Sequence, residues 1–310
     1  MRAIRQQRLG GPEVLELAEL PKPEPAPTEV LIRVRAAGVN PVDWKTRTRG
    51  GFLGEPPFTV GWDVAGIVEA LGRGVTRFEP GDRVFGMPRF PREAAAYAEY
   101  VTSPSRQLAR IPEGLGDIDA AALPLAGLTA WQALVETAEV KQSQRVLVLA
   151  AAGGVGHLAV QIAKARGAYV IGTARRDKHE FLAGIGADEA IDYTEGPVEE
   201  RVDDVDVVLD LVGDDASRRT LAALREGGLY ITVPSSAGIE PLLELARGRV
   251  RVTGILVEPD RAGMEAIAGL VEAGALQVHV SATFPFEDAV RAHELGEAGH
   301  TLGKLVLTVG

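Results

Sequence analysis

The 310-residue sequence contains no cysteine. This absence excludes disulfide bonds, thiolate-ligated metals and a cysteine nucleophile. No stretch approaches the ~18 apolar residues of a membrane span, and segment 1–8 lacks the apolar region of a signal peptide. No serine stands in the G-x-S-x-G pattern of a hydrolase. We therefore expect a cytoplasmic protein that does not span a membrane and is not a thiol or serine hydrolase.

The sequence also lacks an excess of positive charge. It has 33 Lys and Arg against 43 Asp and Glu, a formal net charge of −10, and a pI near 5.2. This balance argues against nucleic acid or an acidic membrane as a partner. The histidines at positions 157, 179, 279, 293 and 300 show no metal-binding spacing, so we expect solvated or capping roles and no metal. The chain length favours two domains.

The most informative segment that is present lies at 145–161. The apolar run 146–150 is typical of a strand covered on both faces. Gly153, Gly154 and Gly156 then allow a tight turn into a helix at 158–166, whose first N–H groups favour an anion. Gly167 and a second strand at 168–173 complete a β-α-β unit. The segment predicts a dinucleotide site that includes Ala152 and Val155. A glycine-rich turn without a ligand is the alternative, because Ala151 replaces the first fingerprint glycine.

The end of the second strand indicates which cofactor binds. An NAD site usually has Asp or Glu there, about 20 residues after the first glycine position. This sequence has Thr173 and Ala174, followed by three cations that can pair with a 2′-phosphate: Arg175, Arg176 and Lys178. We therefore predict NADP(H). An ordinary solvated loop is the alternative for the two arginines.

The rest of the chain divides by pattern. Residues up to about 115 are rich in short strands and turns, including strands at 30–35, 61–69 and 82–85. From 118 onward, helices alternate with apolar strands. Segments 205–212, 228–233 and 250–257 continue the parallel sheet, and a helix is expected at 216–224. The last segment, 258–310, begins helical and ends in a strand at 304–309.

Ordered motifs across nearly the whole chain resemble the medium-chain dehydrogenase/reductase superfamily, and within it the zinc-independent quinone oxidoreductases related to zeta-crystallin. The matching segments are GGPEVL at 10–15, AGVNPVD at 37–43, GDRVFG at 81–86, AYAEYV at 96–101, AALPLAGLTA at 121–130, AGGVG at 152–156 and GADEAIDY at 186–193. Alanine at the first fingerprint position is also typical of that family.

The resemblance implies an α/β protein with a GroES-like β-rich catalytic domain at 1–117, completed by 258–310. A Rossmann domain with a doubly wound parallel sheet would occupy 118–257, with the cofactor in the cleft between the two. Trp62 and Asp63 stand where the alcohol dehydrogenase branch has a His-Glu pair, so a catalytic zinc is not expected. Without a Lewis acid, reduction of a conjugated carbonyl is favoured over alcohol oxidation.

Reduction of a conjugated carbonyl leaves negative charge that the protein must hold and screen. We expect Asn40 to donate to the nicotinamide ribose or to the substrate oxygen. Lys45 would place a cation near the developing enolate, and Asp43 would orient Lys45. The alternatives are that Asp43 caps a helix beginning at Trp44 and that Lys45 is solvated.

The resemblance assigns further cofactor contacts. Thr129, at the start of a helix at 129–140, matches a residue near the nicotinamide carboxamide. Lys178 matches a lysine at the 2′-phosphate, and Tyr193 a tyrosine near the adenosine phosphate. Tyr193 packed at a strand end is the alternative. Gly303 and Lys304 match a C-terminal segment that folds back toward the cofactor. Tyr97 is treated as a packing residue.

A flat conjugated substrate suits an aromatic pocket, for which the candidates are Trp44, Phe52, Phe58, Trp62, Met87 and Phe90; two of these, Phe58 and Trp62, are alternatively core residues. The expected substrate is a quinone or an α,β-unsaturated carbonyl. A standalone enoyl reductase of a biosynthetic pathway and a nucleotide-binding protein with little catalytic activity remain open. We also expect a homodimer, because 250–257 resembles a family edge strand that pairs across a two-fold axis.

Overall fold

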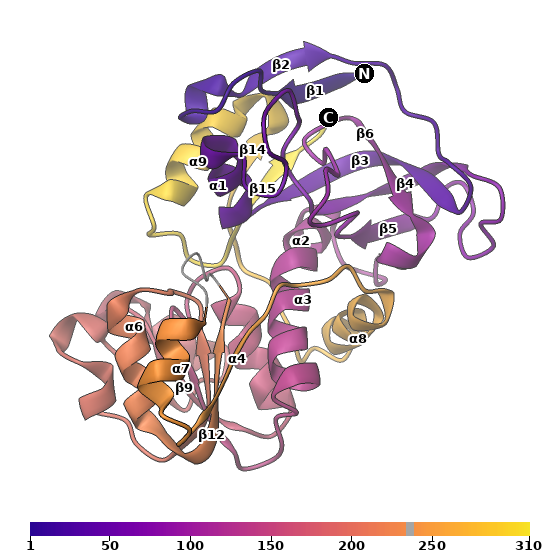
Figure 1. The fold of residues 1–310 in the computed structure, drawn as a ribbon. Coiled ribbons are helices and arrows are strands. Elements are labelled where there is room, and N and C mark those ends of the chain that lie inside the picture. The colour runs from indigo at the N-terminus through magenta and orange to yellow at the C-terminus, as the bar shows by residue number, and fades with distance from the viewer. Residues whose placement is uncertain (234–238) are drawn as a thin grey trace. The chain divides into compact units, whose positions relative to one another are not determined.

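The computed structural model describes residues 1–233 and 239–310. They form two units (Figure 1). Unit 1 contains residues 1–128, 258–274 and 278–310, and unit 2 contains residues 129–257 and 275–277. The predicted fold class is confirmed, because unit 1 is built on an antiparallel-rich sheet and unit 2 on a parallel sheet flanked by helices.

The long strand β3 (Glu29–Val39) organises unit 1. Its buried positions pack into the core of the unit, and it pairs antiparallel with β4 (Val64–Leu71), β6 (Tyr100–Pro104) and β15 (Lys304–Thr308). Leu305 lies opposite Val39. This register brings Lys304, more than 260 residues away in sequence, to the end of β3, where helix α1 (Pro41–Arg49) begins.

The sheet of unit 1 has the strand order β14-β15-β3-β4-β5-β7, and β1 and β2 form a separate pair. The remaining strands of unit 1 are β1 (Arg2–Arg5), β2 (Glu16–Glu19), β5 (Arg83–Gly86), β7 (Leu108–Arg110) and β14 (Val280–Pro285), and its other helices are α2 (Asp117–Ala122), α8 (Arg261–Glu272) and α9 (Ala289–Glu297).

All neighbouring strands of the six-stranded sheet in unit 2 are parallel, in the order β10-β9-β8-β11-β12-β13. The strands are β8 (Arg145–Val148), β9 (Tyr169–Thr173), β10 (Glu189–Ile191), β11 (Val205–Asp210), β12 (Leu224–Thr232) and β13 (Arg251–Gly254). The helices are α4 (Gly156–Ala165), α5 (His179–Gly184), α6 (Asp215–Arg219) and α7 (Glu240–Ala246). Apolar runs such as that of β8 are buried on both faces, as expected.

Three predicted helix boundaries were wrong. The helix expected at 216–224 is the short α6 followed by a 3-10 turn, because β12 already begins at Leu224, which pairs with Val205. The helix expected from 129 is α3 (Pro124–Trp131), which continues as a π-helix at Gln132–Thr137. Proline suits the first position of a helix because its missing N–H is not needed there. For the same reason α1 begins at Pro41 and not at Trp44.

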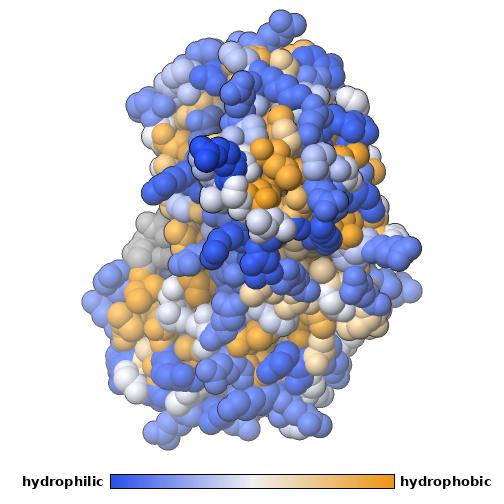
Figure 2. All heavy atoms as spheres, turned by 90° about the vertical axis from the view of Figure 1, so that its right-hand side faces the viewer, coloured by the Kyte–Doolittle hydropathy of each residue, from blue (hydrophilic) through white to orange (hydrophobic). Residues whose placement is uncertain are grey.

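No helix among the residues that the structure describes is both long and apolar enough to cross a bilayer. On the face drawn in Figure 2, hydrophilic side chains lie between groups of hydrophobic ones.

Candidate functional site

A glycine turn joins β8 to α4. Gly153, Gly154 and Val155 are half-buried, and α4 begins at Gly156 without an acidic residue in its first turn. A Cβ on Gly156 would collide with the Ala150 carbonyl oxygen and lie 2.7 Å from the Cα of Ala151. Because backbone cannot yield as a flexible side chain can, the turn requires glycine there. The open first turn of α4 fits the phosphate groups of a dinucleotide.

The alanines of this turn are held by the neighbouring strand β9. Ala150 donates its N–H to the Thr173 hydroxyl at 3.1 Å, and Ala151 donates to the Thr173 carbonyl at 2.9 Å. A Cβ on Gly172 would lie 2.9 Å from the Ala151 methyl group. Thr173, predicted to contact the cofactor, is buried, and its hydroxyl and carbonyl hold the turn. Ala152 is buried as well.

The predicted cations follow β9 directly. Arg175 and Arg176 are exposed, and Lys178 is half-buried. The Nε of Arg175 donates to the hydroxyl of exposed Tyr193 at 3.3 Å, so two predicted residues from adjacent strand ends lie together.

The nearest buried carboxylate, Asp192, is already engaged. It accepts from the backbone N–H and hydroxyl of Thr194 and from the backbone N–H of Arg176. The bonds from Thr194, then that from Arg176, keep the pKa of Asp192 below its usual value. This carboxylate therefore organises the cationic loop. Asp177 is exposed.

In unit 1, Asn40 is the N-cap of α1, and Asp43 is its third helical residue. Asp43 Oδ2 accepts the Asn40 backbone N–H at 2.7 Å, as in a capping box. The expected alternative, that Asp43 caps a helix starting at Trp44, was therefore wrong in its register.

The amide of Asn40 lies between Lys304 and Asp63, and all three side chains are buried. Lys304 Nζ donates to Asn40 Oδ1 and, at 2.9 Å, to the Val39 carbonyl. Asn40 Nδ2 donates to Asp63 Oδ2 at 2.8 Å, and Lys304 lies 3.7 Å from the same oxygen. Burial raises the pKa of Asp63 and lowers that of Lys304. Lys304, predicted to bind the cofactor, is buried in unit 1 and bonded to Val39 and Asn40.

The predicted contact between Asp43 and Lys45 is not present. The Oδ2 of Asp43 also accepts from the Tyr97 hydroxyl at 2.9 Å, and its Oδ1 has no hydrogen-bond partner among the described residues. Two positions apart on a helix, Asp43 and Lys45 face different sides, and Lys45 is exposed. Burial raises the pKa of Asp43 to about 7.

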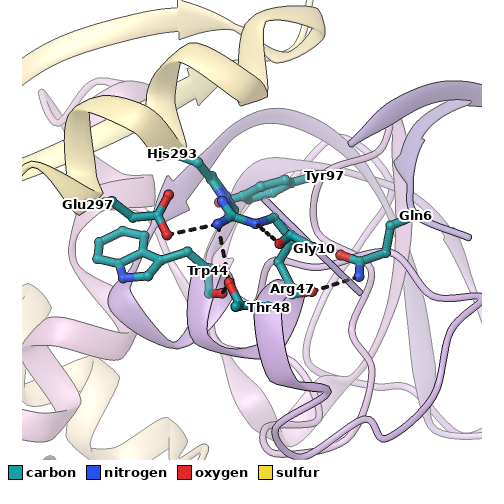
Figure 3. Close-up of polar contacts among 8 residues, drawn as sticks. All are labelled: Gln6, Gly10, Trp44, Arg47, Thr48, Tyr97, His293 and Glu297. Carbon is teal, nitrogen blue, oxygen red and sulfur yellow. Dashed lines mark hydrogen bonds and ion pairs between the residues drawn. The ribbon is translucent and has the colours of Figure 1, made fainter. Parts of the chain in front are cut away.

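From Tyr97, whose hydroxyl donates to Asp43, a chain of buried polar groups continues to His293 and Arg47. Figure 3 shows Tyr97, His293 and Arg47. Tyr97 contacts His293 Nε2 at 3.2 Å, and Arg47 Nη1 lies 2.9 Å from His293 Nδ1. Because a guanidinium only donates, Nδ1 is the acceptor and Nε2 carries the proton of neutral His293. Burial, with a further contribution from Arg47, lowers the pKa of His293 to about 3. The guanidinium also donates to Gly10 O at 3.1 Å and to Glu297 at 2.8 Å.

Sequence reasoning missed this chain. Tyr97 is buried, as expected of a packing residue, but its hydroxyl also bonds Asp43. His293, expected in a solvated or capping role, is buried and contacts Tyr97 and Arg47. His157, for which the same roles were expected, is buried and contacts the Gly153 carbonyl. Asp63 was noted only beside Trp62. The one sequence signal for a role of Asp63 is that it follows Trp62, the position that holds a histidine in the alcohol dehydrogenase branch.

Comparisons with known proteins agree on one group. Residues 26–113 match the alcohol dehydrogenase GroES-like domain, and residues 185–307 match the zinc-binding dehydrogenase family. The chain is 34% identical to the quinone oxidoreductase of Rattus norvegicus over 99% of this chain and 97% of that protein. The chain belongs to the medium-chain dehydrogenase/reductase superfamily. Within it, the chain falls among the quinone oxidoreductases related to zeta-crystallin.

Solved structures of this superfamily support the same assignment. A quinone oxidoreductase from Coxiella burnetii has a TM-score of 0.95 and 39% identity, covering 100% of this chain and 99% of that one. The quinone oxidoreductase of Escherichia coli complexed with NADPH has a TM-score of 0.90 and 32% identity, covering 99% and 100%.

The described part of the chain does not supply a set of metal-binding side chains where other members of the superfamily bind zinc. Trp62 donates its indole N–H to the Arg92 carbonyl at 2.7 Å, and an indole offers a metal no lone pair. Asp63 is engaged by Asn40 and, at 2.7 Å, by the Leu125 N–H. The described residues contain no group of three or more His, Cys, Asp or Glu side chains suited to a metal ion.

The predicted aromatic pocket is only partly assembled. Phe90 packs edge-on against Phe52 and Trp62, with ring centroids 5.5 and 5.4 Å apart. Phe58 belongs to the core of unit 1, which was the alternative given for it. Trp44 contacts His293 of α9, with ring centroids 6.1 Å apart. Met87, also proposed for the pocket, is fully buried.

Two remaining cofactor candidates occupy constrained positions. Thr129 is buried inside α3, not at the start of a helix. Gly303 has φ of 69°, and a Cβ there would collide with the His279 carbonyl. Glycine at 303 is thus required by the backbone of unit 1.

Proposed function

We propose that this chain is an NADPH-dependent oxidoreductase that reduces a quinone or an α,β-unsaturated carbonyl. The observation that carries the proposal is the glycine turn at Gly156 together with the cations Arg175 and Arg176, which follow the adjacent strand β9. The buried carboxylate beside these cations, Asp192 at the end of β10, is already hydrogen-bonded. Family membership supplies the reaction class.

The cofactor would be held by local features of unit 2. The N–H groups of the turn and of the start of α4 would bind the pyrophosphate. The cations Arg175, Arg176 and Lys178 would bind the 2′-phosphate, beside Tyr193. When bound, NADPH supplies the hydride.

Residues of unit 1 would serve the electron acceptor. Asn40 would donate its amide N–H to a ligand oxygen, and Lys45 would screen negative charge on the reduced carbonyl. The rings of Phe52 and Phe90 would contact a flat conjugated group, with the fully buried Trp62 packed behind Phe90. No zinc is needed in this scheme, because spreading charge over a conjugated carbonyl replaces the stabilisation that a Lewis acid gives an alkoxide.

The proposal is tested by following NADPH absorbance with quinones, short enones and acyl thioesters, before and after EDTA treatment. We expect turnover with quinones or enones that survives EDTA. Turnover confined to acyl thioesters would indicate an enoyl reductase instead. NADPH binding with no turnover across the panel would indicate a nucleotide-binding protein.

The choice of cofactor is tested by titrating NADPH and NADH into the wild type and into a triple variant, Arg175→Ala, Arg176→Ala and Lys178→Ala. We expect the triple variant to bind NADPH about 10- to 100-fold more weakly, because charge-assisted bonds to the phosphate are lost. NADH affinity should change little. Equal affinities of the wild type for both cofactors would contradict the assignment.

We also propose a homodimer formed along β13. This strand is the edge of the sheet in unit 2, and Leu256, just after it, is 53% exposed. A second copy would pair with the open edge. Light scattering at micromolar concentration tests this. A monomer mass for the wild type, or a dimer unchanged by Val252→Pro, which removes an N–H on the open side of β13, would exclude β13 as the interface.

A further inference from the structure

Asn40 is the only asparagine in the 310-residue chain. Capping α1 does not by itself require it, since serine, threonine or aspartate also serve as N-caps. Its side chain is buried, and both ends of the amide are bonded to charged groups from distant segments, Lys304 and Asp63. These contacts indicate a specific task for the amide.

The two charged neighbours determine which way the amide faces. An ammonium has only donors, so Lys304 requires the oxygen Oδ1 of Asn40. The Asp63 oxygen accepts from Nδ2 at 2.8 Å. A flipped amide would place an N–H against the ammonium and an oxygen against the carboxylate, losing both bonds. Among the residues that the structure describes, the second N–H of Nδ2 has no hydrogen-bond partner.

The neighbours are themselves anchored to the backbone of unit 1. Lys304 also donates to the Val39 carbonyl at 2.9 Å. The second oxygen of Asp63 accepts the Leu125 N–H at 2.7 Å. The backbone N–H of Asn40 is held by Asp43. Side chain and backbone of Asn40 are therefore fixed independently.

We propose that Lys304 and Asp63 are positioning residues that orient the Asn40 amide, so that its remaining N–H donates to an oxygen atom of a bound ligand. This inference rests on the proposed function for its ligand, which is either the cofactor or the carbonyl substrate. It assigns Lys304 to the orientation of Asn40 and not to direct cofactor binding.

The orientation can be tested without any ligand. Because the chain has one asparagine, labelling with ¹⁵N-asparagine gives a single side-chain amide in the NMR spectrum. We expect Lys304→Met and Asp63→Leu each to shift both Nδ2 proton signals and to speed their exchange with solvent; neither variant adds an asparagine. Lys141→Met, which removes an exposed lysine of unit 2, should leave them unchanged. Thermal melts establish that each variant is folded, and Asp63→Leu carries the test if Lys304→Met does not fold.

Asn40 signals that superimpose on those of the wild type in both variants would overturn the positioning role.

For the ligand, we expect Asn40→Ala and Lys304→Met each to lower kcat/KM about 10- to 100-fold. Because Lys304 acts through Asn40, the double variant should be no more than about twofold worse than Asn40→Ala. Losses that multiply would contradict the proposal.

NADPH affinity measured by fluorescence without substrate identifies the ligand. Weaker NADPH binding in Asn40→Ala assigns the N–H to the cofactor, whereas unchanged NADPH binding with lower kcat/KM assigns it to the substrate. If Asn40→Ala changes neither, the ligand role is wrong. Failure of the proposed function looks different, since the wild type would then reduce no quinone or enone while the NMR result still holds.

Discussion

Two clusters of polar side chains, one in each unit, are organised in opposite ways. The buried cluster of unit 1 comprises Asn40, Asp43, Arg47, Asp63, Tyr97, His293 and Lys304, each at most 1% exposed except Lys304 at 3%. The cationic cluster of unit 2 comprises Arg175, Arg176, Lys178 and Tyr193, which are exposed or half-buried. In the first, the protein satisfies almost every donor and acceptor itself. In the second, the side chains remain accessible to solvent or to a ligand.

This difference predicts how substitutions act. A buried donor that loses its partner costs about 1–3 kcal/mol, because no water replaces it. An exposed group is resolvated, and the effect on folding is small. The buried cluster should therefore control the free energy of unfolding and pKa values, and the cationic cluster should control ligand affinity.

The largest effect is expected at Arg47, which is 1% exposed and bonds Gly10, His293 and Glu297. Arg47→Met leaves the Gly10 carbonyl and His293 Nδ1 without donors, so we expect a loss of about 3 kcal/mol in the free energy of unfolding. Arg49→Met, on the exposed side of the same helix, should change it by less than about 0.5 kcal/mol. Urea denaturation measures both. Equal effects would remove the distinction between buried and exposed groups.

A second test uses the pH dependence of folding. Asp43 has its pKa raised to about 7, and His293 has its pKa lowered to about 3. Between roughly pH 4 and 6.5, folded Asp43 is protonated and folded His293 is neutral, whereas unfolded chains carry the opposite forms. Each state thus binds one proton, and the two contributions to the pH slope cancel. The other titratable and charged groups that face this pair are the same in every variant described below: Tyr97, Arg47, Asp63 and Lys304.

Removing either group should expose the slope of the other. In His293→Gln, only Asp43 remains, the folded state binds more protons, and stability should fall as pH rises through this window. In Asp43→Asn, only His293 remains, the unfolded state binds more protons, and stability should rise with pH. Each slope should differ from that of the wild type by at most about 1.4 kcal/mol per pH unit, with opposite signs. Urea titrations at several pH values measure this, and slopes of the same sign would contradict it.

The same contrast explains what the sequence could reveal. The glycine turn and the cations at 175–178 are local in sequence, so strand, turn and charge patterns identified both. The alternation of helices and apolar runs predicted a parallel sheet, but not the order of its strands. These features depend on neighbours within about 30 residues.

The buried cluster could not be found in that way. Lys304 meets Asn40 only because β15 pairs with β3, and His293 meets Tyr97 only because α9 packs onto the same core. No local pattern distinguishes such a lysine or histidine from a surface one. Asp43 was therefore paired with Lys45, its neighbour in sequence, and not with Tyr97, its neighbour in space.

The smallest effects come from one chemical change made in both regions. Tyr97→Phe removes a buried hydroxyl bonded to Asp43 at 2.9 Å, and Tyr193→Phe removes an exposed one bonded to Arg175 at 3.3 Å. We expect about 1–2 kcal/mol of lost stability for Tyr97→Phe and less than about 0.5 kcal/mol for Tyr193→Phe. Urea denaturation measures both losses, and NADPH titration should detect no more than a small change in Tyr193→Phe, since the cations remain. A larger loss of stability in Tyr193→Phe than in Tyr97→Phe would show that burial does not set the cost of losing a hydroxyl in this protein.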